Sequence, residues 1–135
     1  MSTMTFVNLP VKDLARSKQF FTSLGFGFNE QFGDDSTACL VLSDLAFVLL
    51  HVEPTFAQFT QQEVADTSKT REVLIGLSAD SRGAVDELVD RAVAGGGQSL
   101  GDAQDQGFMY MRAFLDPDGH QWSSVFMDMS AVPGA

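Results

Sequence analysis

The stretch "FLDPDGHQWSSVFMD", Phe114–Asp128, decides the fold of this chain. It predicts two strands joined by a tight turn, because "DPDG" is rich in turn-forming residues and lies between two apolar runs. His120 follows the turn directly, where polar residues are normally exposed, and we expect it to be a solvated turn residue. The hairpin raises the question of whether it supplies a metal ligand or only closes a sheet.

The chain repeats one order of elements. Its first half predicts a strand over Thr5–Val11, a helix between Asp13 and Gly25, and three strands at "FGFNEQF", "TACLVL" and "LAFVLLHV". The second half predicts a strand over Val73–Ala79, a helix after Ser81 that ends at a run of three glycines, and strands near "GQSLGDA", "GFMYMRAFL" and "QWSSVFM". Asp13 and Ser81 are suitable helix caps. Both halves therefore read strand–helix–strand–strand–strand, with an offset of about 68 residues.

Two motifs carry a resemblance to a known family. "NLPVKDLARSKQFFTSLGF", Asn8–Phe26, and "FLDPDGHQW", Phe114–Trp122, resemble the vicinal oxygen chelate superfamily, which includes glyoxalase I, bleomycin-resistance proteins, fosfomycin-resistance proteins and extradiol dioxygenases. The resemblance covers essentially the whole chain. It implies an α+β fold in which two βαβββ modules form curved mixed sheets around a cavity. We expect a single domain over residues 1–135, with module one at about 4–53, a connector at about 54–71 and module two at about 72–128.

Composition and charge exclude several classes of partner. The formal net charge is -10, from 18 acidic and 8 scattered basic residues, which argues against binding nucleic acid or an anionic membrane. The single cysteine, Cys39, excludes an internal disulfide and lies in an apolar run, where we expect a buried, inert thiol. The N-terminal residues lack the pattern of a signal peptide, and no apolar run is long enough to span a membrane. A cytoplasmic protein is expected.

The resemblance also implies where a metal would bind. Many members hold one divalent ion, such as Zn, Ni, Mn or Fe, with His, Glu or Gln ligands from the first and last strands of the modules. The positions that correspond here are Phe6, Leu74 and Ser123, which are poor ligands or none. The fourth position falls on "LAFVLLHV", where Leu49 and His51 share a face and only His51 could coordinate. We therefore expect no metal cofactor, with His51 as the one weak candidate.

The remaining polar side chains give the other candidates for a ligand pocket. Asn8 either presents its amide to the cavity or bonds a neighbouring strand. Tyr110 and Arg112 share a face with Phe114, so Arg112 either anchors an anionic or carbonyl ligand or pairs with surface acids. His51 is a pocket residue, a hydrogen-bonded core residue or a lone metal ligand. The candidate pocket residues are Phe6, Asn8, His51, Leu74, Tyr110, Arg112 and Ser123.

Two function classes follow. The first is a metal-independent binder of a small, partly apolar molecule, since twelve of the aromatic residues are Phe and have no polar group. The alternative is an enzyme of the same superfamily, either a metal-dependent lyase or dioxygenase or a catalyst that uses His51, Tyr110 or Arg112 directly. The resemblance also implies a homodimer. In the connector, Phe56 and Phe59 either cover the mouth of the cavity or pack into the core.

Overall fold

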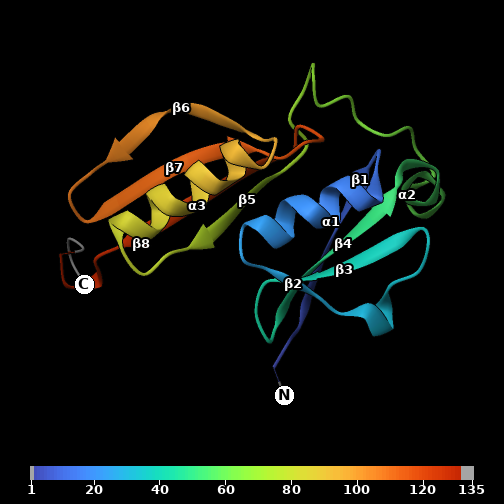
Figure 1. The fold of residues 1–135 in the computed structure, drawn as a ribbon, viewed down its shortest axis with the longest axis horizontal. Coiled ribbons are helices and arrows are strands. Elements are labelled where there is room, and N and C mark those ends of the chain that lie inside the picture. The colour runs from blue at the N-terminus through green and yellow to red at the C-terminus, as the bar shows by residue number, and fades with distance from the viewer. Residues whose placement is uncertain (1, 132–135) are drawn as a thin grey trace. The chain divides into compact units, whose positions relative to one another are not determined.

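The computed structural model of the chain describes residues 2–131. Its contacts divide the chain into two compact units, with the boundary between Asp66 and Thr67. Each unit contains one four-stranded sheet with one long helix on a face of that sheet (Figure 1).

The first unit follows the predicted order. It consists of β1 (Thr5–Val11), α1 (Leu14–Ser23), β2 (Gly27–Phe28), the short 3-10 helix η1 (Glu30–Phe32), β3 (Thr37–Val41), β4 (Ala46–Val52) and α2 (Glu53–Thr60). The strand order is β1-β4-β3-β2; β1 and β4 are parallel, and the other pairs are antiparallel.

The second unit repeats this topology. It consists of β5 (Leu74–Ser78), α3 (Arg82–Ala94), β6 (Gln98–Asp105), β7 (Met109–Leu115), β8 (Gln121–Met127) and η2 (Met129–Ala131). The strand order is β5-β8-β7-β6, again with a parallel pair between the first and last strands. The predicted α+β class, with two four-stranded mixed sheets from a duplicated βαβββ pattern, is confirmed.

Local chemistry sets the ends of the helices as the sequence predicts. The Asp13 side chain accepts a hydrogen bond from the backbone N–H of Arg16, and the Ser81 hydroxyl accepts one from that of Ala84. These caps satisfy backbone donors that have no partner inside the helix. Gly95 is the C-terminal cap residue of α3.

One predicted strand is much shorter than expected. "FGFNEQF" pairs only over Gly27–Phe28, because the Asn29 side chain accepts a hydrogen bond from Gln31 N and starts η1. Asn competes with strand pairing in this way through local side-chain to backbone bonds. Phe32 therefore lies in η1 and not in the strand.

Each sheet has one face covered by its helix and one face that its helix leaves open. In β1, Leu9 and Val11 are buried, at 2% and 1% exposure, while Phe6 is 51% exposed. This agrees with the alternation of the strand, which places Phe6 and Asn8 opposite the Val/Leu side. We call the side of each sheet opposite its long helix the open face. Within residues 2–131, no helix is long and apolar enough to cross a membrane.

Candidate functional site: a pocket on the open face of the first sheet

The first unit contains a pocket of about 620 Å³. This volume lies in the range of small-molecule sites, which are mostly apolar with a few polar groups. We call it the first-sheet pocket. It is lined by Met4, Phe6, Asn29, Phe32, Asp34, Thr37, Cys39, Phe47, Leu49, His51 and Phe59.

Aromatic side chains from four separate segments surround this pocket. Phe6 on β1 and Phe47 on β4 stack with ring centroids 5.3 Å apart. Phe32 comes from η1 and Phe59 from α2, and their exposed fractions are 67% and 70%. Contiguous exposed aromatic surfaces are uncommon on soluble proteins and are frequent at interaction sites, which makes this pocket the candidate site.

His51 forms a polar part of the pocket wall and is only 3% exposed. Its Nδ1 lies 2.8 Å from the Thr37 hydroxyl and its Nε2 lies 2.7 Å from Asn8 Oδ1. Asn8 donates from Nδ2 to the Phe6 carbonyl, so Oδ1 is its acceptor. His51 therefore carries its hydrogen on Nε2 and accepts from Thr37 on Nδ1.

Burial lowers the pKa of His51, and the nearby charge of Asp34 opposes this only in part. A neutral ring with both nitrogens engaged has no lone pair left for a metal. Of the alternatives for Asn8, the structure shows the bond to a neighbouring strand, since His51 lies on β4.

The sequence places Leu49 and His51 on one face of their strand and Phe6 on the face of the first strand opposite the helix, and all three line the first-sheet pocket. It missed Phe32, Asp34 and Thr37. Of the two alternatives for Phe59, it lies at the pocket, while Phe56 lies near the His51 ring at 6.5 Å. Cys39 is 2% exposed, and burial raises the pKa of its thiol, in agreement with an inert cysteine.

Leu74 and Ser123 lie in the second unit, on the open face of its sheet. Gly76 pairs with Ser123 in the parallel register, and Leu74 lies two residues before Gly76 on β5. Leu74 is 59% exposed and Ser123 is 5% exposed. Neither side chain supplies the anionic or imidazole donor that a divalent metal prefers.

The side chains at the positions that the resemblance implies do not form a donor set for a metal. In the part of the chain that the structure describes, no group of three or more His, Cys, Asp or Glu side chains is arranged to hold a metal ion.

Tyr110 and Arg112 lie on the opposite face of the second sheet, under α3. The Tyr110 hydroxyl donates to Asp86 at 2.8 Å, and Arg112 Nη1 lies 3.2 Å from both Asp86 and Asp90. Of the two alternatives for Arg112, the structure therefore shows pairing with acids. Asp86 and Asp90, four residues apart on α3, are the signal that the sequence offered for this arrangement.

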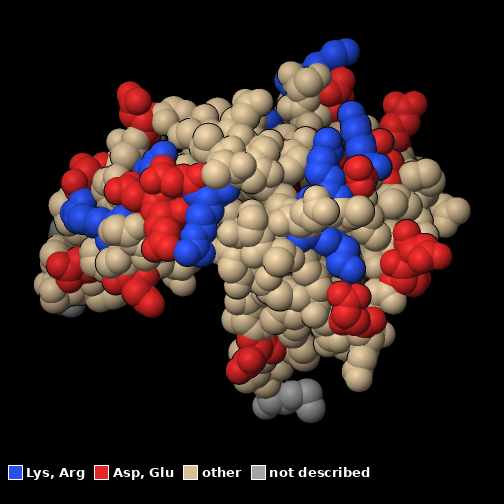
Figure 2. Space-filling model, viewed as in Figure 1, with Lys and Arg blue, Asp and Glu red and all other residues tan. Residues whose placement is uncertain are grey.

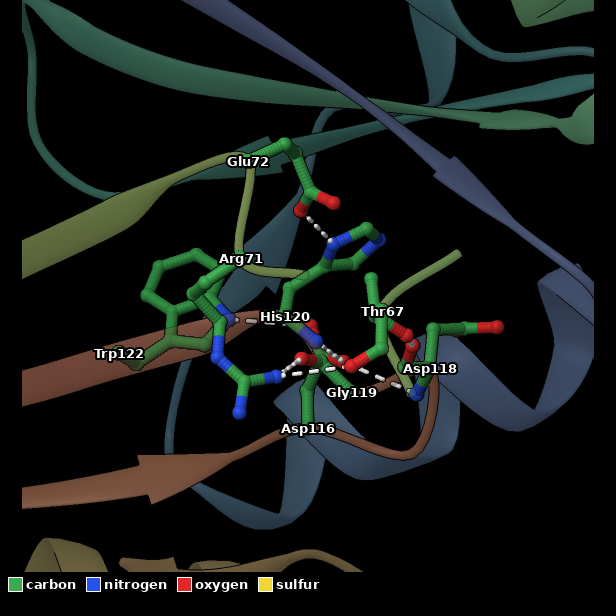
Figure 3. A network of polar contacts seen from close by, with 8 residues as sticks. All are labelled: Thr67, Arg71, Glu72, Asp116, Asp118, Gly119, His120 and Trp122. Atoms are coloured by element: carbon green, nitrogen blue, oxygen red, sulfur yellow. Dashed lines mark hydrogen bonds and ion pairs between the residues drawn. The ribbon is translucent and has the colours of Figure 1, made fainter. Parts of the chain in front are cut away.

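The prediction that His120 is a solvated turn residue is wrong, since His120 is 1% exposed. Its Nδ1 lies 2.6 Å from Glu72 Oε1, which comes from the segment before β5 (Figure 3). Asp116 accepts from His120 N through Oδ1 and from Trp122 Nε1 through Oδ2, at 3.0 Å in each case.

A second set of bonds fixes the same turn to the chain before β5. The Thr67 hydroxyl donates to the Asp118 carbonyl at 2.6 Å, and Arg71 Nη1 donates to the Gly119 carbonyl at 2.8 Å (Figure 3). We call this assembly the turn network; it comprises Thr67, Arg71, Glu72, Asp116, Asp118, Gly119, His120 and Trp122. Its bonds connect backbone and side chains of one unit, so its role is structural.

Comparisons with known proteins identify the family. Residues 3–123 match the Glyoxalase/Bleomycin resistance protein/Dioxygenase superfamily. The chain belongs to this superfamily. No curated protein matches its sequence.

Several solved structures share the fold of this chain. A hypothetical protein from S. aureus superposes with a TM-score of 0.81 at 28% identity, covering 93% of this chain and 95% of that one. A glyoxalase/bleomycin resistance protein/dioxygenase family enzyme from Burkholderia phytofirmans PsJN gives 0.79 at 18% identity, covering 93% and 99%. A bleomycin resistance determinant encoded on the transposon Tn5 gives 0.66 at 21% identity, covering 95% and 100%. The family model establishes the superfamily, these structures show the shared fold, and neither distinguishes among the superfamily's many functions.

Proposed function

We propose that this member of the superfamily binds a small, partly apolar molecule in the first-sheet pocket, without a divalent metal. The observation that carries the proposal is the pocket itself: about 620 Å³, walled by phenylalanines, with His51 hydrogen-bonded at both ring nitrogens. A preformed apolar pocket with few polar groups favours binding by burial of apolar ligand surface.

The donor chemistry supports a metal-free site. Phe6, Leu74 and Ser123 occupy the positions where the family's ligands are implied, and His51 is neutral with no lone pair available. The alternative, a metal-dependent lyase or dioxygenase, requires a donor set that these side chains do not provide.

The charge pattern supports a small-molecule ligand over a polyanion. On the face shown in Figure 2, basic side chains lie beside acidic ones, and the chain carries a net charge of -10. A phosphate backbone needs a concentrated basic surface. The cytoplasmic location and the homodimer expected from the sequence stay predictions.

Filling the pocket tests the proposal. We expect Leu49→Trp to occupy the first-sheet pocket, because Leu49 lines it, and to lower the affinity of a small apolar ligand by more than about tenfold. The ligand is selected from a small-molecule library by the rise in unfolding temperature that any binder of the native state causes.

Leu45→Trp is the matched control, because Leu45 is 46% exposed and is not among the residues that line the pocket. Equal affinity in both variants contradicts the assignment of the site. Metal analysis of protein purified without chelators tests the second half of the proposal, and stoichiometric Zn, Ni, Mn or Fe would overturn it.

A further inference from the structure

The charges of the side chains that line the first-sheet pocket bear on the class of ligand that it binds. Among the described residues that line it, Asp34 is the one acidic side chain, and no Lys or Arg is present. His51 is neutral for the reasons given above. The pocket therefore presents a negative charge beside an apolar aromatic surface.

Only one of the two oxygens of the Asp34 carboxylate is engaged in hydrogen bonds to the described residues. Oδ1 accepts the backbone N–H groups of Ser36 and Thr37 at 2.8 and 2.9 Å. Within the described residues no contact occupies Oδ2. This oxygen is available to a positively charged or hydrogen-bond-donating ligand group.

The other polar lining groups offer little to an anion. The Thr37 hydroxyl donates to His51, and His51 donates to Asn8. The Asn29 side chain uses its oxygen to accept from Gln31 N, which leaves its neutral amide N–H₂ as a donor. Arg112, the cation expected to anchor an anion, is bound to Asp86 and Asp90 under α3.

The phenylalanines supply the complementary feature. Phe6, Phe32 and Phe59 each expose more than half of their surface, and Phe47 stacks on Phe6. The face of an aromatic ring carries negative charge density and attracts a cation, most strongly one that is weakly hydrated, such as a quaternary ammonium. Four such rings and one carboxylate line one pocket, which is the combination of groups that recognises organic cations.

We propose that the first-sheet pocket selects an apolar organic cation, such as a quaternary or tertiary ammonium with an aromatic or alkyl body, over neutral and anionic molecules of the same shape. This inference rests on the proposed binding function and names its ligand class. The cationic head lies among the phenylalanine rings close to Asp34, and the apolar body is buried against Leu49 and Met4.

A ligand series that differs only in charge tests this selection. The probes are phenylpropyl trimethylammonium, its uncharged carbon isostere with a tert-butyl head, and a phenylalkyl carboxylate of the same length. Isothermal titration calorimetry should give the cation about tenfold higher affinity than the neutral isostere. The carboxylate should bind more weakly than the isostere, because like charges repel in a pocket of low dielectric.

Variants assign the selectivity to its source. Asp34→Asn keeps the acceptor for Ser36 N and Thr37 N but removes the charge, and should lower the ratio of cation affinity to isostere affinity by about tenfold. Asp35→Asn is the matched control, since it removes the same charge one residue away and outside the pocket, and should leave the affinity ratio unchanged. Phe59→Leu keeps an apolar side chain without a π face and should lower the ratio by about threefold.

The outcomes separate the two proposals. Equal affinity for cation and isostere, or tightest binding of the carboxylate, overturns the cation selection and leaves the pocket function in place. No binding of any probe at millimolar concentration overturns both. Cation binding that Leu49→Trp leaves intact lies elsewhere and also contradicts the inference.

Discussion

His51 and His120 stand in two modules of the same topology but in different surroundings. His51 lies on β4, in the wall of a pocket, and is bonded to Thr37 and Asn8. His120 lies in the turn directly before β8 and is bonded to Glu72 inside the turn network. The two histidines do not occupy equivalent positions of the repeat: His51 pairs with Pro10 near the end of β4, whereas His120 precedes the first residue of β8. One lines a pocket and the other fastens a turn, so the same residue type has different surroundings in the two modules.

The largest effect is expected where the turn network is most crowded. A Cβ on Gly119 would lie 2.5 Å from Thr67 Oγ1, and Gly119 has a φ of 83°. Gly119→Ala should therefore lower the free energy of unfolding by about 3–4 kcal/mol, from backbone strain and overpacking together. Urea denaturation followed by circular dichroism measures it.

Gly107→Ala provides a close control, because Gly107 has the same φ of 83° and nothing within 4 Å of its Cβ position. It should cost only the backbone part, about 1–2 kcal/mol. Equal losses in the two variants would mean that the contact with Thr67 contributes nothing.

The next largest loss of stability is expected when each of the two histidines is replaced by leucine. His120→Leu removes a buried bond to Glu72, whose side chain is 25% exposed, and should lower the free energy of unfolding by about 2–3 kcal/mol. His51→Leu leaves Asn8 and Thr37 beside a pocket that water can enter, and should cost about 1 kcal/mol. A reversed order of the two losses would refute the division of roles.

A smaller effect is expected at Arg112. Its side chain is 20% exposed and pairs with two more exposed acids, so Arg112→Gln should cost about 1 kcal/mol or less. Ligand affinity should not change, because the pocket lies on the other module. A loss of affinity greater than about threefold would return Arg112 to the candidate site.

The smallest effect we expect is a pH dependence from His51. Burial lowers its folded pKa below the ordinary value of about 6.5, so the unfolded chain takes up a proton first as the pH falls. The stability that neutral His51 contributes is present above the unfolded pKa and is lost as the pH falls through the folded pKa. The contribution of His51 is the difference between the unfolding free energies of wild type and His51→Leu measured from pH 8 to pH 5, because His120 is common to both. Parallel curves of stability against pH would contradict the lowered pKa.

Much of the fold was predictable, because its signals are local. Asp13 and Ser81 cap helices through neighbouring residues, and alternation in β1 assigned Phe6 to the open face. The turn network was missed because Glu72 and Thr67 lie far from His120 in sequence, and nothing beside His120 marks its burial. Phe32 was missed for a different reason: a single Asn29 cap ends β2 and redirects the chain.

The strand residues of the candidate site could be predicted from the sequence, but its loop and helix residues could not. Alternation along the strand placed Leu49 and His51 on one face, and the resemblance pointed to Phe6. Asp34 and Phe59 come from a loop and from α2, whose positions depend on tertiary packing and not on periodicity. The face of the second sheet on which Arg112 lies depends on the register of β7 against β8, in which Arg112 pairs with Ser124 and not with Ser123.

The parallel pair in each sheet has a consequence for how the chain folds. Thr5 pairs with Ala46 and Leu74 pairs with Gln121, so in each sheet the first strand along the chain pairs with the last. Neither sheet can close until its last strand has been synthesised, and such long-range pairing slows folding relative to hairpin formation. The first sheet, complete at Val52, can form while the ribosome is still translating the second.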